Sequence, residues 1–309
     1  MARPVQIGNE APAITAPAGK AEDSRFRSLL REFRQDARWW FGIVLLIFTL
    51  AAIFAPQVSP YNPLLYHPSL VEQPPSWAHL LGTDSSGRDQ LSRVIYGARI
   101  SLSIGVLSIL MGGLAGILLG MLAAYFKGWV DQLVTIVVDA LLAFPSLILA
   151  LALLAALGPS LVNVAVALAI VRIPLYARLA RGQTLQIAAQ DYVAAARCTG
   201  TKTSRILMRH ILPNIFSPLL VQATLSISFA ILDESVLSYL GLGAAPPTPE
   251  WGSMITDAQQ FIYTDPWMML GPALAIVLVL LSLNIVGDAL RDRLDPRDAR
   301  RIDLPLRKS

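Results

Sequence analysis

The sequence predicts an all-α membrane protein with six transmembrane helices. Hydrophobic residues make up 54% of the 309-residue chain and charged residues only 15%, whereas a soluble domain usually carries about 25% charged residues. The hydrophobic residues also gather in long blocks, and the stretches 100–126, 214–232 and 266–287 contain no charged residue. Because about 20 apolar residues are needed to span a bilayer as a helix, these blocks indicate membrane spans rather than a large soluble core.

A polar and basic N-terminal tail, 1–38, precedes the first predicted span at 39–56. Trp39 and Trp40 suit the membrane interface, where tryptophan is enriched. A cleaved signal peptide would have a shorter charged region and a small-residue cleavage site after a short apolar core. We therefore expect 39–56 to be a retained signal anchor.

Five further spans are predicted, at 100–126, 131–157, 161–180, 215–237 and 270–289. They divide the rest of the chain into an external loop at 57–99, a core domain at 100–290 and a C-terminal tail at 291–309. Of the chain's 25 Lys and Arg residues, this topology leaves only three outside, namely Arg88, Arg93 and Arg99. Because basic residues favour the cytoplasmic side, we expect both termini in the cytoplasm.

The second span carries small residues at every fourth position, at Gly112, Gly116, Gly120 and Ala124. Such a stripe lets the backbone of a neighbouring helix approach closely. We interpret it as a helix-packing face rather than a ligand site.

Asp139 and Arg172 lie within the third and fourth predicted spans. Counted at 1.5 Å per residue from opposite membrane faces, each lies about 15 Å deep, near the middle of the bilayer. Charges there usually pair or line a water-filled cavity. The hypothesis is that the two residues form an ion pair, and the alternative is that each faces a translocation path separately.

The stretch DYVAAARCTGTKTSRILMRHILPN, Asp191–Asn214, is polar and basic but lies between the fourth and fifth spans. Asp191 is a candidate N-cap for a helix over Tyr192–Cys198, and Gly200 suits the left-handed residue that ends a helix. Cys198, the only cysteine, is read as a small packing residue.

Thr201 or Thr203 is expected to cap a second short helix, and Pro213 to limit it before the fifth span. The stretch would then form a helix–turn–helix on the cytoplasmic face. Periodicity alone leaves two interpretations open, a basic loop on anionic lipid and a docking surface for a cytoplasmic partner. A DNA-binding role is disfavoured because both ends are tethered to spans.

The "AAA" at Ala194–Ala196, Gly200 and "HILPN" at His210–Asn214 resemble the EAA loop of ABC-importer permeases. The stretches HLLGTDSSGRDQLSRVIYGARISL, LSYLGLGAAPPTPEWGSMI and LNIVGDALRDRLDPR resemble the dipeptide, oligopeptide and nickel permease group, and its "C" permeases in particular. This resemblance implies the type I ABC importer permease fold in a bacterial inner membrane. It also implies that the loop at 185–214 is the coupling helix that binds the ATPase, through Asp191, Tyr192, Ala194, Ala195, Ala196, Gly200, His210, Leu212 and Pro213.

One position departs from the family pattern. The acidic residue of the loop would fall at position 194, where this chain has alanine. An acid three residues after Asp191 could close a capping box, so its absence is expected to cost about 0.5–1 kcal/mol of capping energy. The departure also puts in doubt any charge contact of that residue with the ATPase.

The resemblance also implies the partners. They are a second homologous permease subunit, two ATP-binding subunits that hold ATP and Mg²⁺, an external solute-binding protein and membrane lipid, with no nucleic acid. The outer segment 238–269 has no Lys or Arg, and we expect Glu250, Trp251 and Asp257 to contribute to docking of the binding protein.

The residues themselves support no site for a cofactor, a metal or catalysis. No phosphate-binding G-x-x-x-x-G-K-[ST] loop is present, and the three histidines are too far apart for metal ligands. The resemblance implies the function of a permease subunit for dipeptides or oligopeptides, and the residues give no sign of an enzymatic activity of its own. Nickel or glutathione import, an ion-gradient-driven secondary transporter and a membrane anchor or sensor without transport are the alternatives.

Overall fold

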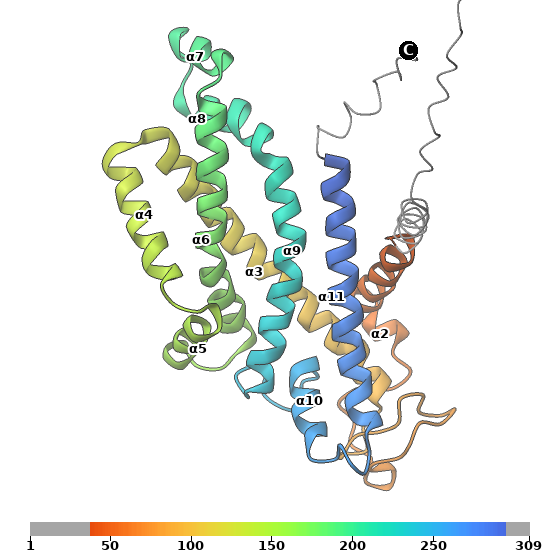
Figure 1. Ribbon diagram of the computed structural model, residues 1–309. Coiled ribbons are helices and arrows are strands. Elements are labelled where there is room, and N and C mark those ends of the chain that lie inside the picture. The colour runs from red at the N-terminus through yellow and green to blue at the C-terminus, as the bar shows by residue number, and fades with distance from the viewer. Residues whose placement is uncertain (1–37, 295–309) are drawn as a thin grey trace, which may run out of the picture. The chain divides into compact units, whose positions relative to one another are not determined.

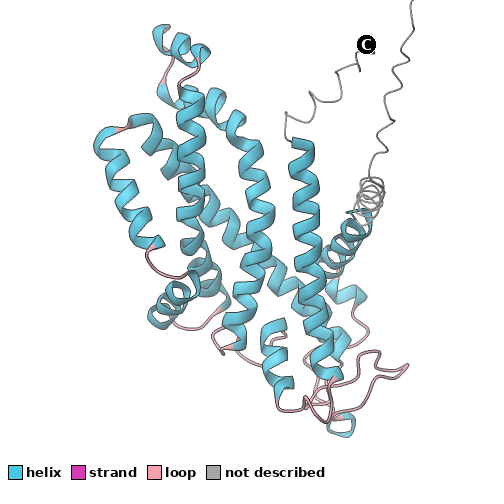
Figure 2. Cartoon of the chain, in the orientation of Figure 1, coloured by secondary structure: helices cyan, strands magenta, loops and turns pink. Residues whose placement is uncertain are grey.

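The computed structural model describes residues 38–294, so most of the two predicted tails lies outside the described residues. Met1–Trp40 and Phe41–Ser309 are separate units, and the fold described here is that of the second. Figure 2 shows this part of the chain as helices joined by loops, and its only β-bridge joins Thr83 and Asp89. The all-α prediction is therefore confirmed.

A largely irregular segment at 59–89 separates the first two helices from the remaining ones. An apolar helix at Arg38–Ile53 comes first. The labelled elements then are α2 (Ala55–Val58), η1 (Pro68–Leu70), α3 (Gln90–Phe126), α4 (Gly128–Leu142), α5 (Ser146–Leu157), α6 (Leu161–Ala188), α7 (Asp191–Cys198), α8 (Thr203–Arg205), η2 (Ile206–Ile211), α9 (Leu212–Tyr239), α10 (Trp251–Gln259) and α11 (Trp267–Leu294).

Four helical stretches of the described chain are long and apolar enough to cross a membrane, namely α3, α6, Thr203–Tyr239 and α11. The α4–α5 pair counts as a fifth span if it is taken as one. The predicted span at 131–157 corresponds to the α4–α5 pair, whose two helices are bent by 93° at a break over residues 143–145. Proline lacks the N–H that would continue the helical ladder, which explains the position of the break.

The helix α3 begins at Gln90, well before the predicted residue 100. The carboxylate of Asp89 caps it by accepting from the Ser92 backbone N–H at 2.8 Å and from the Ser92 hydroxyl at 2.7 Å. His79 Nδ1 lies 2.9 Å from the other oxygen of Asp89. The motif that includes GTDSSGRDQ therefore ties the preceding loop to the start of α3.

The glycine stripe of α3 packs against α6, as predicted. A Cβ atom added at Gly112, Gly116 or Gly120 would lie 2.2–2.5 Å from a backbone carbonyl oxygen of α6. No side chain fits at such a distance, so the close approach of the two helices depends on glycine. Figure 1 shows α3 crossing behind α6 and α9, and this crossing holds the centre of the bundle together.

Candidate coupling loop and intramembrane charges

The turn after α7 has the left-handed geometry predicted at Gly200, where φ is +72°. The Gly200 N–H donates to the Arg197 carbonyl at 3.0 Å, and the Thr201 N–H donates to the Ala196 carbonyl at 3.1 Å. These two bonds form a Schellman motif, which satisfies carbonyls that the helix end leaves free. The turn chemistry therefore reverses the chain compactly between α7 and α8.

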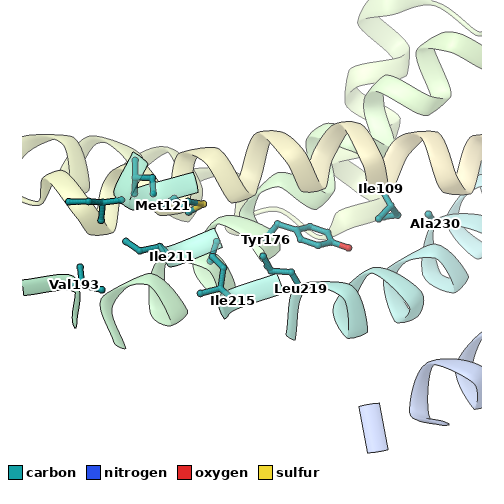
Figure 3. Close-up of a cluster of buried hydrophobic side chains, with 11 residues drawn as sticks. Ile109, Met121, Tyr176, Val193, Ile211, Ile215, Leu219 and Ala230 are labelled. Atoms are coloured by element: carbon teal, nitrogen blue, oxygen red, sulfur yellow. The ribbon is translucent and has the colours of Figure 1, made fainter. Parts of the chain in front are cut away.

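One face of α7 is anchored to the helix bundle. Val193 is 0% exposed and belongs to a hydrophobic cluster with Met121 of α3, Tyr176 of α6 and Ile211 of η2. Figure 3 shows Val193 at one end of this cluster, which continues along α9 past Leu219 to Ala230. The cluster therefore connects the loop directly to three of the long helices.

The opposite face of α7 is exposed and made largely of small side chains. Asp191, Tyr192, Ala194 and Ala195 are all exposed, and Ala196 is partly buried. Tyr192 contacts the residues before and within the start of α9. Its hydroxyl accepts from the Asn214 amide at 3.4 Å, and the centres of the Tyr192 and His210 rings are 6.3 Å apart. Figure 1 shows α7 at one end of the bundle, so this exposed face is open to a partner.

The predicted caps of the two short helices are wrong. The N-cap of α7 is Gln190 and that of α8 is Lys202, and neither side chain makes a capping bond. Asp191 is instead the first residue of α7, where a carboxylate still favours the positive end of the helix dipole. An acid at position 194 would therefore not sit at the third helical position, so the capping-box cost expected for Ala194 does not apply.

Pro213 does not end a helix, in contrast to the prediction. It is the second residue of α9, and the helical stretch runs on from Thr203 to Tyr239. The preceding η2 is a π-helix, a wider turn that occurs often at functional sites. Pro213 lies inside this stretch and cannot donate the next helical bond, and the wider turn of η2 directly precedes it.

Arg197 lies over the ring of Tyr125 at the end of α3, with its guanidinium carbon 4.7 Å from the ring centre. This cation–π contact adds a polar link between α7 and α3. The neighbouring Cys198, interpreted from the sequence as a small packing residue, is exposed.

Asp139 and Arg172 do not pair with each other. Arg172 of α6 forms an ion pair with Asp233 of α9, and both side chains are 13% exposed. Asp139 of α4 pairs with Arg178 of α6 at 2.6 Å, and these side chains are 53% and 60% exposed. Depth alone suggested the wrong pair, because it does not say which neighbour each face of α6 meets.

A third ion pair lies on the same side of α6 as Arg178. Arg181 donates from Nε and Nη2 to the two carboxylate oxygens of Asp131, at 2.6 and 2.7 Å. Sequence reasoning missed Asp233, Arg178 and this pair because they sit near the ends of apolar runs. Helical spacing could have indicated these pairs, because Asp131 and Asp139 are eight residues apart and therefore lie on the same side of α4.

Glu250 and Trp251 are buried at the α10 end of the bundle, each with 0% exposure. One carboxylate oxygen of Glu250 accepts from the Ser238 hydroxyl at 2.6 Å and from the Ala244 N–H at 2.8 Å. The indole of Trp251 donates to the Val94 carbonyl at 3.0 Å. Their predicted role as an exposed docking surface is therefore wrong, and they hold the C-terminal end of α9 and the start of α10 in place.

Asp257, the third residue of that prediction, is exposed on α10. Neighbouring protein atoms displace some of the water around its carboxyl group and raise the pKa of that group, and the positive charges of Arg93 and Arg88 oppose this rise. Of the three predicted docking residues, only Asp257 is therefore available to a partner.

Comparisons with known proteins agree with this architecture. Residues 116–299 match the family described as "Binding-protein-dependent transport system inner membrane component". Residues 24–75 match "N-terminal TM domain of oligopeptide transport permease C".

Curated relatives cover most of the chain. The dipeptide transport system permease protein DppC of Alkalihalophilus pseudofirmus is 42% identical over 89% of this chain and 90% of its own length. The protein of the same name in Escherichia coli is 47% identical over 83% and 88%. The glutathione transport system permease protein GsiD of Pectobacterium atrosepticum is 40% identical over 92% and 97%.

An inward-facing structure of the MetNI methionine ABC transporter is similar with a TM-score of 0.54 and 18% identity, over 66% of this chain and 96% of that one. At this identity the likeness shows the fold alone, and it confirms the type I ABC importer permease fold. The chain therefore belongs to the binding-protein-dependent transport system inner membrane components and is a multi-pass membrane permease.

Proposed function

We propose that this chain is a transmembrane subunit of an ATP-driven importer that moves dipeptides or oligopeptides into the cell. The relatives named for dipeptide transport in Alkalihalophilus pseudofirmus and Escherichia coli support this solute class. The relative named for glutathione transport makes glutathione, itself a tripeptide, the second candidate.

The observation that carries the proposal is the arrangement of side chains on the two faces of α7. Its exposed face offers Ala194 and Ala195, whose side chains are small enough for a close fit in a partner's cleft. Its other face inserts Val193 into the hydrophobic cluster shared by α3, α6 and α9. A partner that moves α7 would therefore move the long helices with it, since packed interiors transmit displacement.

The partners follow from this role. Two ATP-binding subunits would supply ATP, Mg²⁺ and hydrolysis, one at this loop and one at the matching loop of a second permease subunit. An external solute-binding protein would deliver the peptide at the α10 end. ATP-driven closure of the ATPase pair would then turn the spans from inward-facing to outward-facing.

The same proposal sets the orientation. The loop carries Arg197, Lys202, Arg205 and Arg209, and basic residues favour the cytoplasmic side. The α7 end and both chain termini are accordingly placed in the cytoplasm of a bacterial cell, with α10 outside.

The test is assembly and uptake with the α7 surface altered. Ala195→Arg adds bulk to the exposed face while arginine remains a good helix former. We expect this variant to insert normally but to lose co-purification with the ATP-binding subunits and dipeptide uptake in proteoliposomes. Ala78→Arg, at an exposed alanine of the 59–89 segment, is the matched control and should co-purify like the wild type.

Co-purification and uptake at wild-type levels with Ala195→Arg would contradict the docking role of α7. Uptake by this chain without any ATP-binding subunit would instead favour an ion-gradient-driven transporter. Competition of labelled dialanine by glutathione separates the two solute candidates, since an excess of glutathione should not reduce uptake by a dipeptide importer.

A further inference from the structure

A charged groove lies between α4 and α6 and has no role in the coupling loop. Asp131, Thr135 and Asp139 follow one another at four-residue spacing, so they share one face of α4. Arg178 and Arg181 of α6 face them and form the two ion pairs described above. The groove between these helices has a volume of about 370 Å³, within the size range of small-molecule sites.

The exposure of this groove is unusual for helices that cross a membrane. The Asp139 and Arg178 side chains are 53% and 60% exposed, whereas the other intramembrane pair, Arg172–Asp233, is almost covered. Exposed charges in a bilayer are costly and are found facing water or a polar partner. A groove with such exposed charges therefore suits water or a protein partner better than lipid.

The break between α4 and α5 points to the same place. Asp139 lies in the last turn of α4, where its backbone carbonyl accepts the final bond, from Ala143. Residues 143–145 at the break are exposed. In a membrane, non-helical backbone occurs where it is covered by protein or lines a water-filled cavity, and broken helices often form the solute sites of transporters.

We propose that this groove lines the solute path and that the Asp139–Arg178 pair binds the charged ends of a zwitterionic peptide. Arg178 accepts the terminal carboxylate of the solute, and Asp139 accepts its terminal ammonium group. Each side chain exchanges its internal partner for an equal charge on the solute, so no charge is left unpaired during the exchange. Asp131–Arg181, held by two parallel bonds, keeps α4 and α6 together meanwhile.

This inference rests on the proposed function, because it takes the solute to be a peptide with free ends. Its test uses single cysteines in the complete complex with ATP-binding subunits, in a Cys198→Ser background that removes the chain's only cysteine. Thr135→Cys reports on the groove, and Leu133→Cys reports on the opposite, exposed face of α4. Modification of this chain by a charged, membrane-impermeant thiol reagent is followed by mass.

We expect Thr135→Cys to react at least about tenfold faster than Leu133→Cys. Dialanine should slow the reaction at Thr135→Cys, while N-acetyl-dialanine amide, which lacks both charges, should not. Adding Arg178→Gln should abolish protection by dialanine but leave the groove reactive. The matched control combines Arg172→Gln with Asp233→Asn, because it removes an arginine of the same helix outside the groove together with its buried partner, and protection should persist.

Equal, slow reaction at both cysteines would overturn the proposal, since lipid or a second permease subunit would then cover the groove. Reaction at Thr135→Cys that dialanine does not slow would also overturn it. Wild-type uptake of dialanine without protection refutes this inference and leaves the proposed function standing. Absence of both uptake and protection refutes the two together.

Discussion

Replacement of Gly200 tests how strictly the coupling loop depends on its turn. The residue has φ +72°, and a Cβ atom added there meets no other atom within 4 Å. The cost of a side chain is therefore conformational and not steric. For an L-residue the left-handed region costs about 1–2 kcal/mol, and a β-branched side chain such as valine lies at or above the top of this range.

Because about 1.4 kcal/mol is tenfold in an equilibrium, Gly200→Val should lower the population of the native turn roughly tenfold or more. The Schellman bonds from Gly200 and Thr201 would be lost, while Val193 would keep α7 near the bundle. The assay is the ratio of ATP hydrolysed to peptide transported in proteoliposomes that contain the full complex. We expect this ratio to rise several-fold while the amount of inserted protein stays at the wild-type level.

Gly200→Asn is the matched variant, because asparagine enters the left-handed region more readily than other side chains. It should raise the ratio much less than valine does. A wild-type ratio for Gly200→Val would refute the reasoning, since it would show that coupling does not need this turn. Equal defects for the valine and asparagine variants would refute the conformational cause.

Three further predictions concern the helix bundle and α10. Asp233→Asn should lower the stability of the purified chain by about 3–5 kcal/mol, because it leaves Arg172 buried without its partner. In thermal unfolding, adding Arg172→Gln should recover part of this loss. A loss equal to the sum of the two single variants would contradict the pairing. Gly116→Leu should prevent folding, since even a Cβ there would lie 2.5 Å from a carbonyl oxygen of α6, and a normal yield of folded protein in detergent would argue against the close approach. The pKa of Asp257 is raised in the folded state, so the folded protein holds the proton of this carboxyl group more tightly than the unfolded chain does. The stability that this proton contributes is fully present below the ordinary aspartate pKa of about 3.9 and is lost as the pH rises through the raised pKa. Asp257→Asn should remove this slope from the unfolding free energy measured against pH, and an unchanged slope would disprove the assignment.

Local chemistry made most of the membrane spans and the Gly200 turn between α7 and α8 predictable from the sequence. A run of apolar residues indicates a span without reference to any neighbouring helix. A glycine at the end of a helix indicates a left-handed turn through its own backbone freedom, as at Gly200. The glycine stripe on α3 was also readable, because its four-residue spacing is a property of one helix. Each of these features depends on residues close together in the chain.

The features that were missed depend on which faces meet. Asp139 and Arg172 have similar depths but point to different neighbours, and depth along a helix carries no information about direction around it. Glu250 and Trp251 belong to a polar, proline-rich segment that reads as an exposed loop, but α10 folds them against α9 and α3. Burial of this kind arises from tertiary packing, which composition does not reveal.

The position of α6 links the two proposed sites. Only Ala189 and Gln190 separate its end from α7, and Arg178 lies ten residues before that end, about 15 Å along the helix. The same helix therefore carries the anchor of the coupling loop and one wall of the charged groove. A rigid displacement of α7 by an ATPase would shift Arg178 relative to Asp139 unless α4 moved with it. Because two bonds hold Asp131 to Arg181 nearer the loop, such a shift would open the groove at Asp139–Arg178 first, beside the break where the proposed solute site lies.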